Sequence, residues 1–175
     1  ERTWPHEMTR EAIAGREQGK SDALHDNTLP FLRYVQGHAD FTPTMFMADR
    51  LNGSSYAHEL AMVVVFTSPY LCMGDNPTNY LNSVVVDVLK ALPATWDETR
   101  VLPGSEIGEL TMFARRKGGQ WFMGAINDLT PRRETVPLSF LGNGKYRLVE
   151  LADHSDRHDA FVRAERLVTR KDTLV

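Results

Sequence analysis

Two glutamates near the start of the chain have the residue type and the spacing to do chemistry. Glu11 and Glu17 lie on either side of Gly15, shortly after a strand-like segment that ends at Pro5. A separation of six residues rotates side chains on an ideal helix by roughly 240°, so both carboxylates can face one site only if the backbone breaks between them. Gly15 is where that break costs least. The alternative is an exposed helix start, where acidic residues complement the helix dipole.

Three more polar residues follow at positions from which they could line the same site. His25 and Asp26 occupy the stretch after the two glutamates, and Asp40 follows the next predicted helix. A capping or turn pair before that helix is the alternative for His25 and Asp26. A structural hydrogen bond is the alternative for Asp40.

Other polar groupings have simpler explanations. His6 and Glu7 resemble the start of a zinc-protease helix, but the position four residues after the histidine is Arg10, which is no zinc ligand. The acidic and histidine-rich stretch 153–159 has the composition of a metal cluster, and we interpret it as a solvated loop between strands. Trp96 and Trp121 could stack on sugars, but such residues more often fill a core or an interface.

Composition excludes several classes of protein. The chain has 175 residues, of which 42% are hydrophobic and 25% charged, as in ordinary globular proteins. The formal net charge of -3 gives no basic field, so no nucleic-acid partner is expected. The apolar run 60–66 is far shorter than the roughly 20 residues of a membrane helix, so no membrane span is predicted. Cys72 is the single cysteine and has no internal partner, and we interpret it as a buried small hydrophobe.

The first part of the chain, residues 1–97, reads as α/β. Helical patterns are predicted at Thr9–Gln18, Asn27–Val35, 54–65 and 80–89, and residues 40–43 look like a short strand. Helices separated by short strands predict successive βα units of a parallel sheet.

The second part, residues 98–175, reads as all-β. Short segments rich in β-formers are separated by glycine-rich turns, which predicts an antiparallel meander or sandwich. The expected strands are Glu109–Lys117, Trp121–Asn127, Glu134–Phe140, Tyr146–Asp153 and Phe161–Thr169. The expected domain boundary therefore lies near residues 95–100.

Several linked segments together resemble glycoside hydrolase family 97. In order, they are RTWPH, TREAIAGRE, HDNTLPFLR, DFTPTMF, ELAMVVVFTSPY and PATWDETRVLPGSEIGELTMFARRKGGQWFMGAIND. The resemblance implies the last part of a catalytic (β/α)8 barrel followed by a C-terminal β-sandwich. It also implies that an N-terminal β-sandwich and the first half of the barrel precede Glu1, so we expect a piece of a longer protein.

Members of that family are calcium-dependent exo-acting α-glycosidases. The resemblance implies that Glu17 is the general acid (acid/base in retaining members) and that Glu11 is a Ca²⁺ ligand. Both roles fit the chemistry, because a glycosidase needs one protonated carboxyl and Ca²⁺ prefers carboxylate oxygen. His25 and Asp26 would lie at the sugar site. One departure is that many members carry Arg-Gly before the residue preceding the acid, whereas this chain has Ala14-Gly15-Arg16-Glu17.

The partner carboxylate is expected upstream of this chain, so the piece alone should be inactive. The substrate would be an oligosaccharide or another α-glycoside with a terminal α-linked sugar. The stretch 25–30 looks closer to the retaining branch, which includes α-galactosidases. The alternatives are an inverting α-glucosidase of the same family and a non-catalytic carbohydrate-binding or scaffold module built on residues 100–175. Family habit predicts a periplasmic or secreted location.

Overall fold

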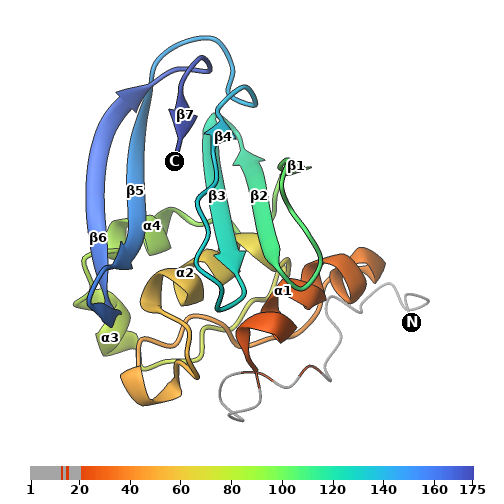
Figure 1. Ribbon diagram of the computed structural model, residues 1–175, viewed down its shortest axis with the longest axis vertical. Helices are drawn as coiled ribbons and strands as arrows, with labels where there is room; N and C mark the ends of the chain where they lie inside the picture. Colours follow the sequence, from red (N-terminus) through yellow and green to blue (C-terminus); the bar gives the residue numbers. More distant parts are fainter. Residues whose placement is uncertain (1–12, 14, 16–20) are drawn as a thin grey trace.

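The computed structural model describes residues 13, 15 and 21–175, so Glu11, Glu17 and most of the predicted helix Thr9–Gln18 lie outside the described residues. Within that part, helices come first and antiparallel strands follow, and in Figure 1 the helices lie beneath the strands. No described helix has the length and apolar character needed to cross a bilayer. The helices are α1 (Ala23–Leu32), α2 (Tyr56–Val65), α3 (Pro77–Leu81) and α4 (Val86–Ala91), with short 3-10 turns η2 (Tyr34–Gln36) and η3 (Ala48–Arg50).

Helix α1 begins earlier than its apolar pattern predicts. The carboxylate of Asp22 accepts a hydrogen bond from the backbone N–H of His25, so the N-cap lies before the expected start at Asn27. Pro30 is therefore inside the helix and not in its first turn. Gly37, at φ 135°, ends the following turn η2, because this backbone conformation is open to glycine.

Helix α2 follows the prediction, whereas the next predicted helix is divided. Ser55 caps α2 by accepting a hydrogen bond from the N–H of His58, as expected for one residue of the serine pair. The single helix expected over 80–89 is wrong, because α3 is capped by Asn76 and ends at Leu81, and α4 starts again at Val86.

Two extended segments flank α2 without forming strands. Ala39 and Phe41 are buried while Asp40 and Thr42 are half-buried, which is the alternation of a strand. The ring of His38 lies 3.3 Å from the carbonyl of Thr67. The N–H of Gly74 donates to the carbonyl of Pro43 at 2.9 Å. Segments 38–43 and 67–74 therefore run side by side in the same direction.

Because segments 38–43 and 67–74 are not strands, the described residues do not form the parallel sheet that the sequence predicts. The first described strand begins at Glu98, and every pairing between described strands is antiparallel. The strands are β1 (Glu98–Val101), β2 (Leu110–Lys117), β3 (Gln120–Asn127), β4 (Val136–Pro137), β5 (Tyr146–His154), β6 (Arg157–Val168) and β7 (Thr173–Leu174).

These strands form three small antiparallel sheets with the orders β1-β2-β3, β4-β7 and β5-β6. In Figure 1 the long β5-β6 hairpin stands apart from the β1-β2-β3 sheet, with β7 between them. The C-terminal part is thus sheet-rich and antiparallel, as predicted. The expected strand Glu134–Phe140 shrinks to β4, since proline has no N–H with which to extend a ladder. The short strands β1 and β7 were not predicted.

The apolar core ties the helices to the sheet. One cluster of buried residues combines positions from α1 and α2 with Phe113 of β2 and Ile126 of β3. The contact between α2 and β3 is very close: a Cβ added at Gly124 would lie 2.8 Å from the carbonyl oxygen of Ala61 and 2.9 Å from the Cβ of Val64. A second cluster joins the three sheets, and its buried members are Leu102, Leu110, Met112, Ala114, Val136, Leu138, Phe140, Leu141 and Val168.

Candidate functional site

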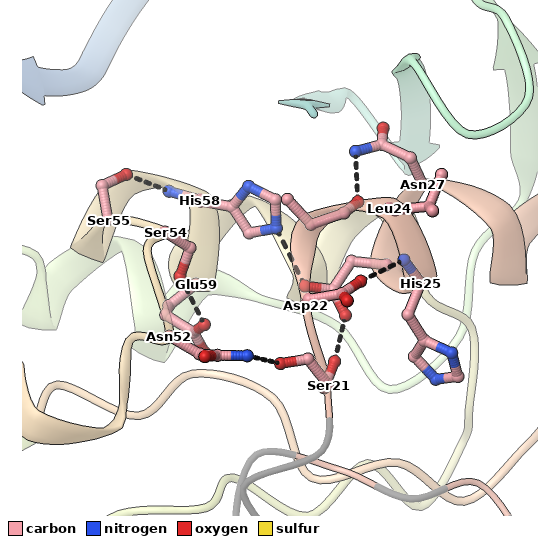
Figure 2. Close-up of polar contacts among 12 residues, drawn as sticks. Ser21, Asp22, Leu24, His25, Asn27, Asn52, Ser54, Ser55, His58 and Glu59 are labelled. Carbon is pink, nitrogen blue, oxygen red and sulfur yellow. Dashed lines mark hydrogen bonds and ion pairs between the residues drawn. The ribbon is translucent and has the colours of Figure 1, made fainter. Parts of the chain in front are cut away.

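A buried polar cluster lies where the N-terminal ends of α1 and α2 meet (Figure 2). Its centre is the carboxylate of Asp26, which is 0% exposed. One carboxylate oxygen accepts a hydrogen bond of 2.5 Å from the hydroxyl of Ser21. The other lies 3.1 Å from Nε2 of His58 on α2. A buried carboxylate is tolerated when it has such partners, so this bridge fixes the two helix ends relative to each other.

A second buried carboxylate organises the neighbouring loop. Glu59, also 0% exposed, accepts hydrogen bonds of 3.2 Å from the N–H groups of Thr44 and Met45. The hydroxyl of Ser54 donates to its other oxygen at 3.3 Å. Thr44 has φ 69°, a costly conformation for a β-branched residue. Glu59 therefore holds a strained turn at the end of the extended segment 38–43.

Ser21 is also fixed through its main chain. The side-chain amide of Asn52 donates to the carbonyl oxygen of Ser21 at 2.8 Å, as Figure 2 shows. Upstream, Ile13 packs against the core cluster formed by α1, α2 and the sheet, and Gly15 is buried. The described chain is thus anchored on both sides of position 17.

His25 differs from Asp26 in its surroundings. Its imidazole points away from His58 in Figure 2. Its Nε2 atom is buried and has no hydrogen-bond partner among the described residues. An imidazole nitrogen in this state can donate to or accept from a bound hydroxyl, so the ring has the chemistry expected of a sugar contact.

The sequence-predicted site is only partly within the described residues. Glu17 and Glu11 lie outside them, so their roles remain predictions. Asp26 is enclosed by Ser21 and His58, which fits a structural role better than a sugar contact, although its substrate role stays a prediction too. Asp40 is half-buried on the outward side of its extended segment.

Sequence reasoning missed Ser21, His58 and Glu59. A signal for Glu59 was present, because it stands three residues after Tyr56 and four before Val63. That spacing puts a carboxylate on the apolar stripe of α2, where a charge must have buried partners.

The remaining groupings behave as structural features. The loop expected over 153–159 is wrong in extent, because β5 continues to His154 and β6 begins at Arg157, which leaves residues 155–156 between them. There Arg157 pairs with Asp159, and the N–H of Asp156 donates to the ring of His154. The part of the chain that the structure describes holds no group of three His, Cys, Asp or Glu side chains able to bind a metal. Trp96 packs against Phe122, with ring centroids 5.4 Å apart. Trp121 packs against Phe140 at 5.0 Å.

A groove of about 320 Å³ lies between α4 and the segment that follows α2. Its lining comes from Val63 of α2 and from residues within 66–73 and 89–96, and no described carboxylate contributes to it. Cys72 is one of the lining residues and is exposed, so the expectation that it is buried is wrong. The groove therefore lacks, among its lining residues, the carboxylate pair typical of a glycosidase site.

Comparison with known proteins gives concordant matches. A family profile described as "Glycosyl-hydrolase 97 C-terminal, oligomerisation" matches residues 95–175. A protein named "Probable retaining alpha-galactosidase" from Streptomyces bingchenggensis (strain BCW-1) is 40% identical over 99% of this chain and 27% of its own length. A "Retaining alpha-galactosidase" from Bacteroides thetaiotaomicron is 33% identical over 91% of this chain and 27% of its length.

A solved structure agrees with these sequences. A variant of a glycoside hydrolase family 97 enzyme from Pseudoalteromonas sp. strain K8, in complex with panose, superposes on this chain with a TM-score of 0.88 at 27% identity. The superposition covers 99% of this chain and 30% of that one. The chain therefore spans less than a third of the length of these relatives.

Proposed function

Because the chain belongs to glycoside hydrolase family 97 and corresponds to its C-terminal region, we propose that it is part of a longer exo-acting α-glycosidase of the retaining α-galactosidase type. The observation that carries this proposal is the 40% identity, over 99% of the chain, to a protein named as a probable retaining α-galactosidase. The partner carboxylate and most of the substrate site would then lie in the part of the enzyme that precedes this chain.

The first part of the chain would complete a (β/α)8 barrel. Supporting this, segments 38–43 and 67–74 run parallel and are joined through α2, which is the order of a βαβ unit. In such barrels the site lies at the C-terminal ends of the strands, where the following helices begin. The buried cluster around Asp26 lies at the N-terminal ends of α1 and α2, the same end of the unit.

Within this enzyme Glu17 would be the acid/base. It would donate a proton to the leaving oxygen and afterwards take one from the attacking water. His25 would contact the sugar, which is supported by the unpartnered Nε2 atom of its ring. The proposed substrate is an oligosaccharide or another α-glycoside with a terminal α-linked galactose.

Glu11 would contribute one carboxylate ligand to a Ca²⁺ ion. Carboxylate oxygen suits this hard cation. Within residues 13, 15 and 21–175 no three His, Cys, Asp or Glu side chains gather in one place, so we assign no complete ligand set to these residues. When bound, the ion would supply a positive field that polarises sugar hydroxyls. We also propose a periplasmic or secreted location.

The assignment of Glu17 is tested in the full-length enzyme by the substitution Glu17→Gln. A missing general acid matters most for poor leaving groups, so hydrolysis of an unactivated α-galactoside should fall by roughly 10²- to 10⁴-fold. Both losses are compared as kcat/KM, which reports the step that forms the glycosyl-enzyme. A dinitrophenyl α-galactoside, whose leaving group needs no proton, should lose far less in kcat/KM. Equal losses on both substrates would contradict the acid role.

The retaining assignment has its own test. NMR of the first-formed sugar should show the α-anomer. The β-anomer would instead support the inverting α-glucosidase alternative, and would leave the family assignment unchanged.

A further inference from the structure

The chain contains two asparagine–glycine dipeptides, Asn52-Gly53 before α2 and Asn143-Gly144 before β5. This dipeptide is the one most prone to spontaneous loss of the asparagine side-chain amide. We propose that Asn143-Gly144 is a self-modification site, at which asparagine converts to aspartate and isoaspartate, and that the fold protects Asn52-Gly53 from the same reaction. Water is the co-reactant, and neither half of the proposal depends on the catalytic reaction.

The modification begins with an intramolecular ring closure. The main-chain nitrogen of the glycine attacks Cγ of the asparagine and forms an N–Cγ bond. The Cγ–Nδ2 bond breaks, and the amide leaves as ammonia with the proton of the glycine N–H. Water then opens the succinimide at one of its two carbonyls, which gives aspartate or isoaspartate. The nitrogen must first approach Cγ, so the asparagine has to rotate about its main-chain and side-chain bonds.

Asn52 is fixed through both its main chain and its side chain. Asn52 and Gly53 have φ 48° and 87°. The N–H of Ser54 donates to the carbonyl of Leu51 at 2.9 Å, which closes a hydrogen-bonded turn around them. The side-chain nitrogen of Asn52, which is the leaving group, donates to the carbonyl of Ser21 at 2.8 Å (Figure 2). Ring closure must therefore break this bond and turn the side chain away from Ser21.

Asn143 has neither restraint within the described part of the chain. It is exposed and lies outside the strands. Its side chain makes one hydrogen bond to the described residues, in which Nη1 of Arg170 donates to Oδ1 at 3.4 Å. A donor on this oxygen favours the attack, because the oxygen gains negative charge as the ring closes. A Cβ at Gly144 would meet nothing within 4 Å, so the space around the attacking nitrogen is open.

The products would also differ in their effect on stability. A carboxylate at position 52 has no proton to donate to the carbonyl of Ser21 and would place negative charge against it. Ser21 also donates its hydroxyl to Asp26, so this change would weaken the buried cluster. A carboxylate at position 143 would instead face the guanidinium of Arg170 in an exposed pair. The fold thus protects the asparagine whose conversion would destabilise it.

The experiment follows both conversions in the full-length enzyme, folded and in concentrated urea, in mildly alkaline buffer. Trypsin separates the sites into peptides 51–90 and 134–145, and fragment spectra locate the mass gain of each conversion. In urea the two dipeptides should convert at similar rates. Folding should slow conversion of Asn52 by roughly 10-fold or more, because its hydrogen bond must break first. Conversion of Asn143 should stay within about 3-fold of its rate in urea.

Equal slowing of both sites on folding would overturn the proposal. A rate difference that is just as large in urea would also overturn it, because the local sequence would then be the cause. The matched substitutions are Asn52→Asp, which should lower Tm, and Asn143→Asp, which should leave Tm unchanged. Failure of Asn52→Asp to fold would agree with the expected loss, and the conversion rates then carry the test. Equal Tm values for the two variants would overturn the protective role of the bond to Ser21.

Discussion

Arg163 on β6 holds Asp87 on α4 through two hydrogen bonds of 2.7 and 2.8 Å, one from each terminal nitrogen of the guanidinium. One of these nitrogens also donates to the carbonyl of Val84 at 2.7 Å. The pair connects residues far apart in sequence and fastens the β5-β6 hairpin to the helical part of the molecule. Bidentate geometry of this kind fixes orientation as well as distance.

Replacing Asp87 by asparagine should remove a small, pH-dependent contribution to stability. The hydrogen bonds from Arg163 are the main cause that lowers the pKa of Asp87 from 3.8 to about 2. Because the folded-state pKa is depressed, the contribution is present above about pH 4 and is lost as the pH falls toward 2. At pH 7 Asp87→Asn should cost less than about 1 kcal/mol, since solvent screens this exposed pair.

Urea denaturation of the wild type and Asp87→Asn at pH 7 and pH 2 checks this expectation. The control is Asp49→Asn, because Asp49 is 76% exposed and lies 3.9 Å from Arg50. It should have no measurable effect at either pH. A difference for Asp87→Asn that persists at pH 2 would contradict the mechanism.

Tyr34→Phe should leave stability unchanged or increase it by as much as about 1 kcal/mol. The hydroxyl of Tyr34 is buried without a hydrogen-bond partner among the described residues. Its ring stacks on Phe66 at 5.1 Å, and phenylalanine keeps that contact. Burial also raises the pKa of Tyr34 above its usual 10. The wild type should therefore lose stability relative to Tyr34→Phe as the pH rises above 10, where only the unfolded tyrosine ionises.

Tyr56→Phe provides the comparison for Tyr34→Phe. The hydroxyl of Tyr56 donates to the carbonyl of Phe46 at 2.7 Å. Its removal should cost about 1 kcal/mol in free energy of unfolding. If both variants lose equal stability in chemical denaturation at pH 7, the hydroxyl of Tyr34 has a partner that the described residues do not provide.

Gly124→Ala should destabilise the protein by about 1–3 kcal/mol or more, because there is no room for a methyl group between β3 and α2. The added carbon would meet a backbone carbonyl oxygen at 2.8 Å. Gly119 is the matched site, since a Cβ there would meet nothing within 4 Å. Thermal denaturation should show a clear loss for Gly124→Ala and almost none for Gly119→Ala. Similar losses of Tm for the two variants would mean that α2 shifts easily away from β3 to make room for the methyl group.

The local pattern of the chain predicts some elements well and others poorly. Helix α2 carries a clear apolar periodicity, and strands β2 and β3 are rich in β-formers and separated by a glycine-rich turn. All three elements were predicted almost to the residue. The break between α3 and α4 was missed because both halves share one apolar pattern across Leu81 and Val86. Strands β1 and β7 were missed because they are short, and their formation depends on pairing with partners that lie far away in sequence.

The residues of the candidate site could likewise be predicted from the sequence only in part. The resemblance to a family predicts roles for Glu17, Glu11 and His25. Local sequence patterns alone do not distinguish these three residues from ordinary solvated ones. The bridge from Asp26 to His58 spans 32 positions, so no local window contains it. Of these buried residues, Glu59 is the one whose burial the sequence indicates, because its spacing places it on the apolar stripe of α2.

The closeness of α2 to β3 also limits how this region can be recombined. The expected boundary at residues 97 and 98 separates two parts of the chain, yet Val65 of α2 and Ile126 of β3 belong to one buried cluster. A hybrid that takes its C-terminal strands from a relative needs a residue without a side chain at position 124. It also needs a helix in the place of α2 whose backbone can pack directly against position 124. Relatives that supply the C-terminal strands should therefore be chosen first for compatibility at this contact, and only then for overall sequence identity.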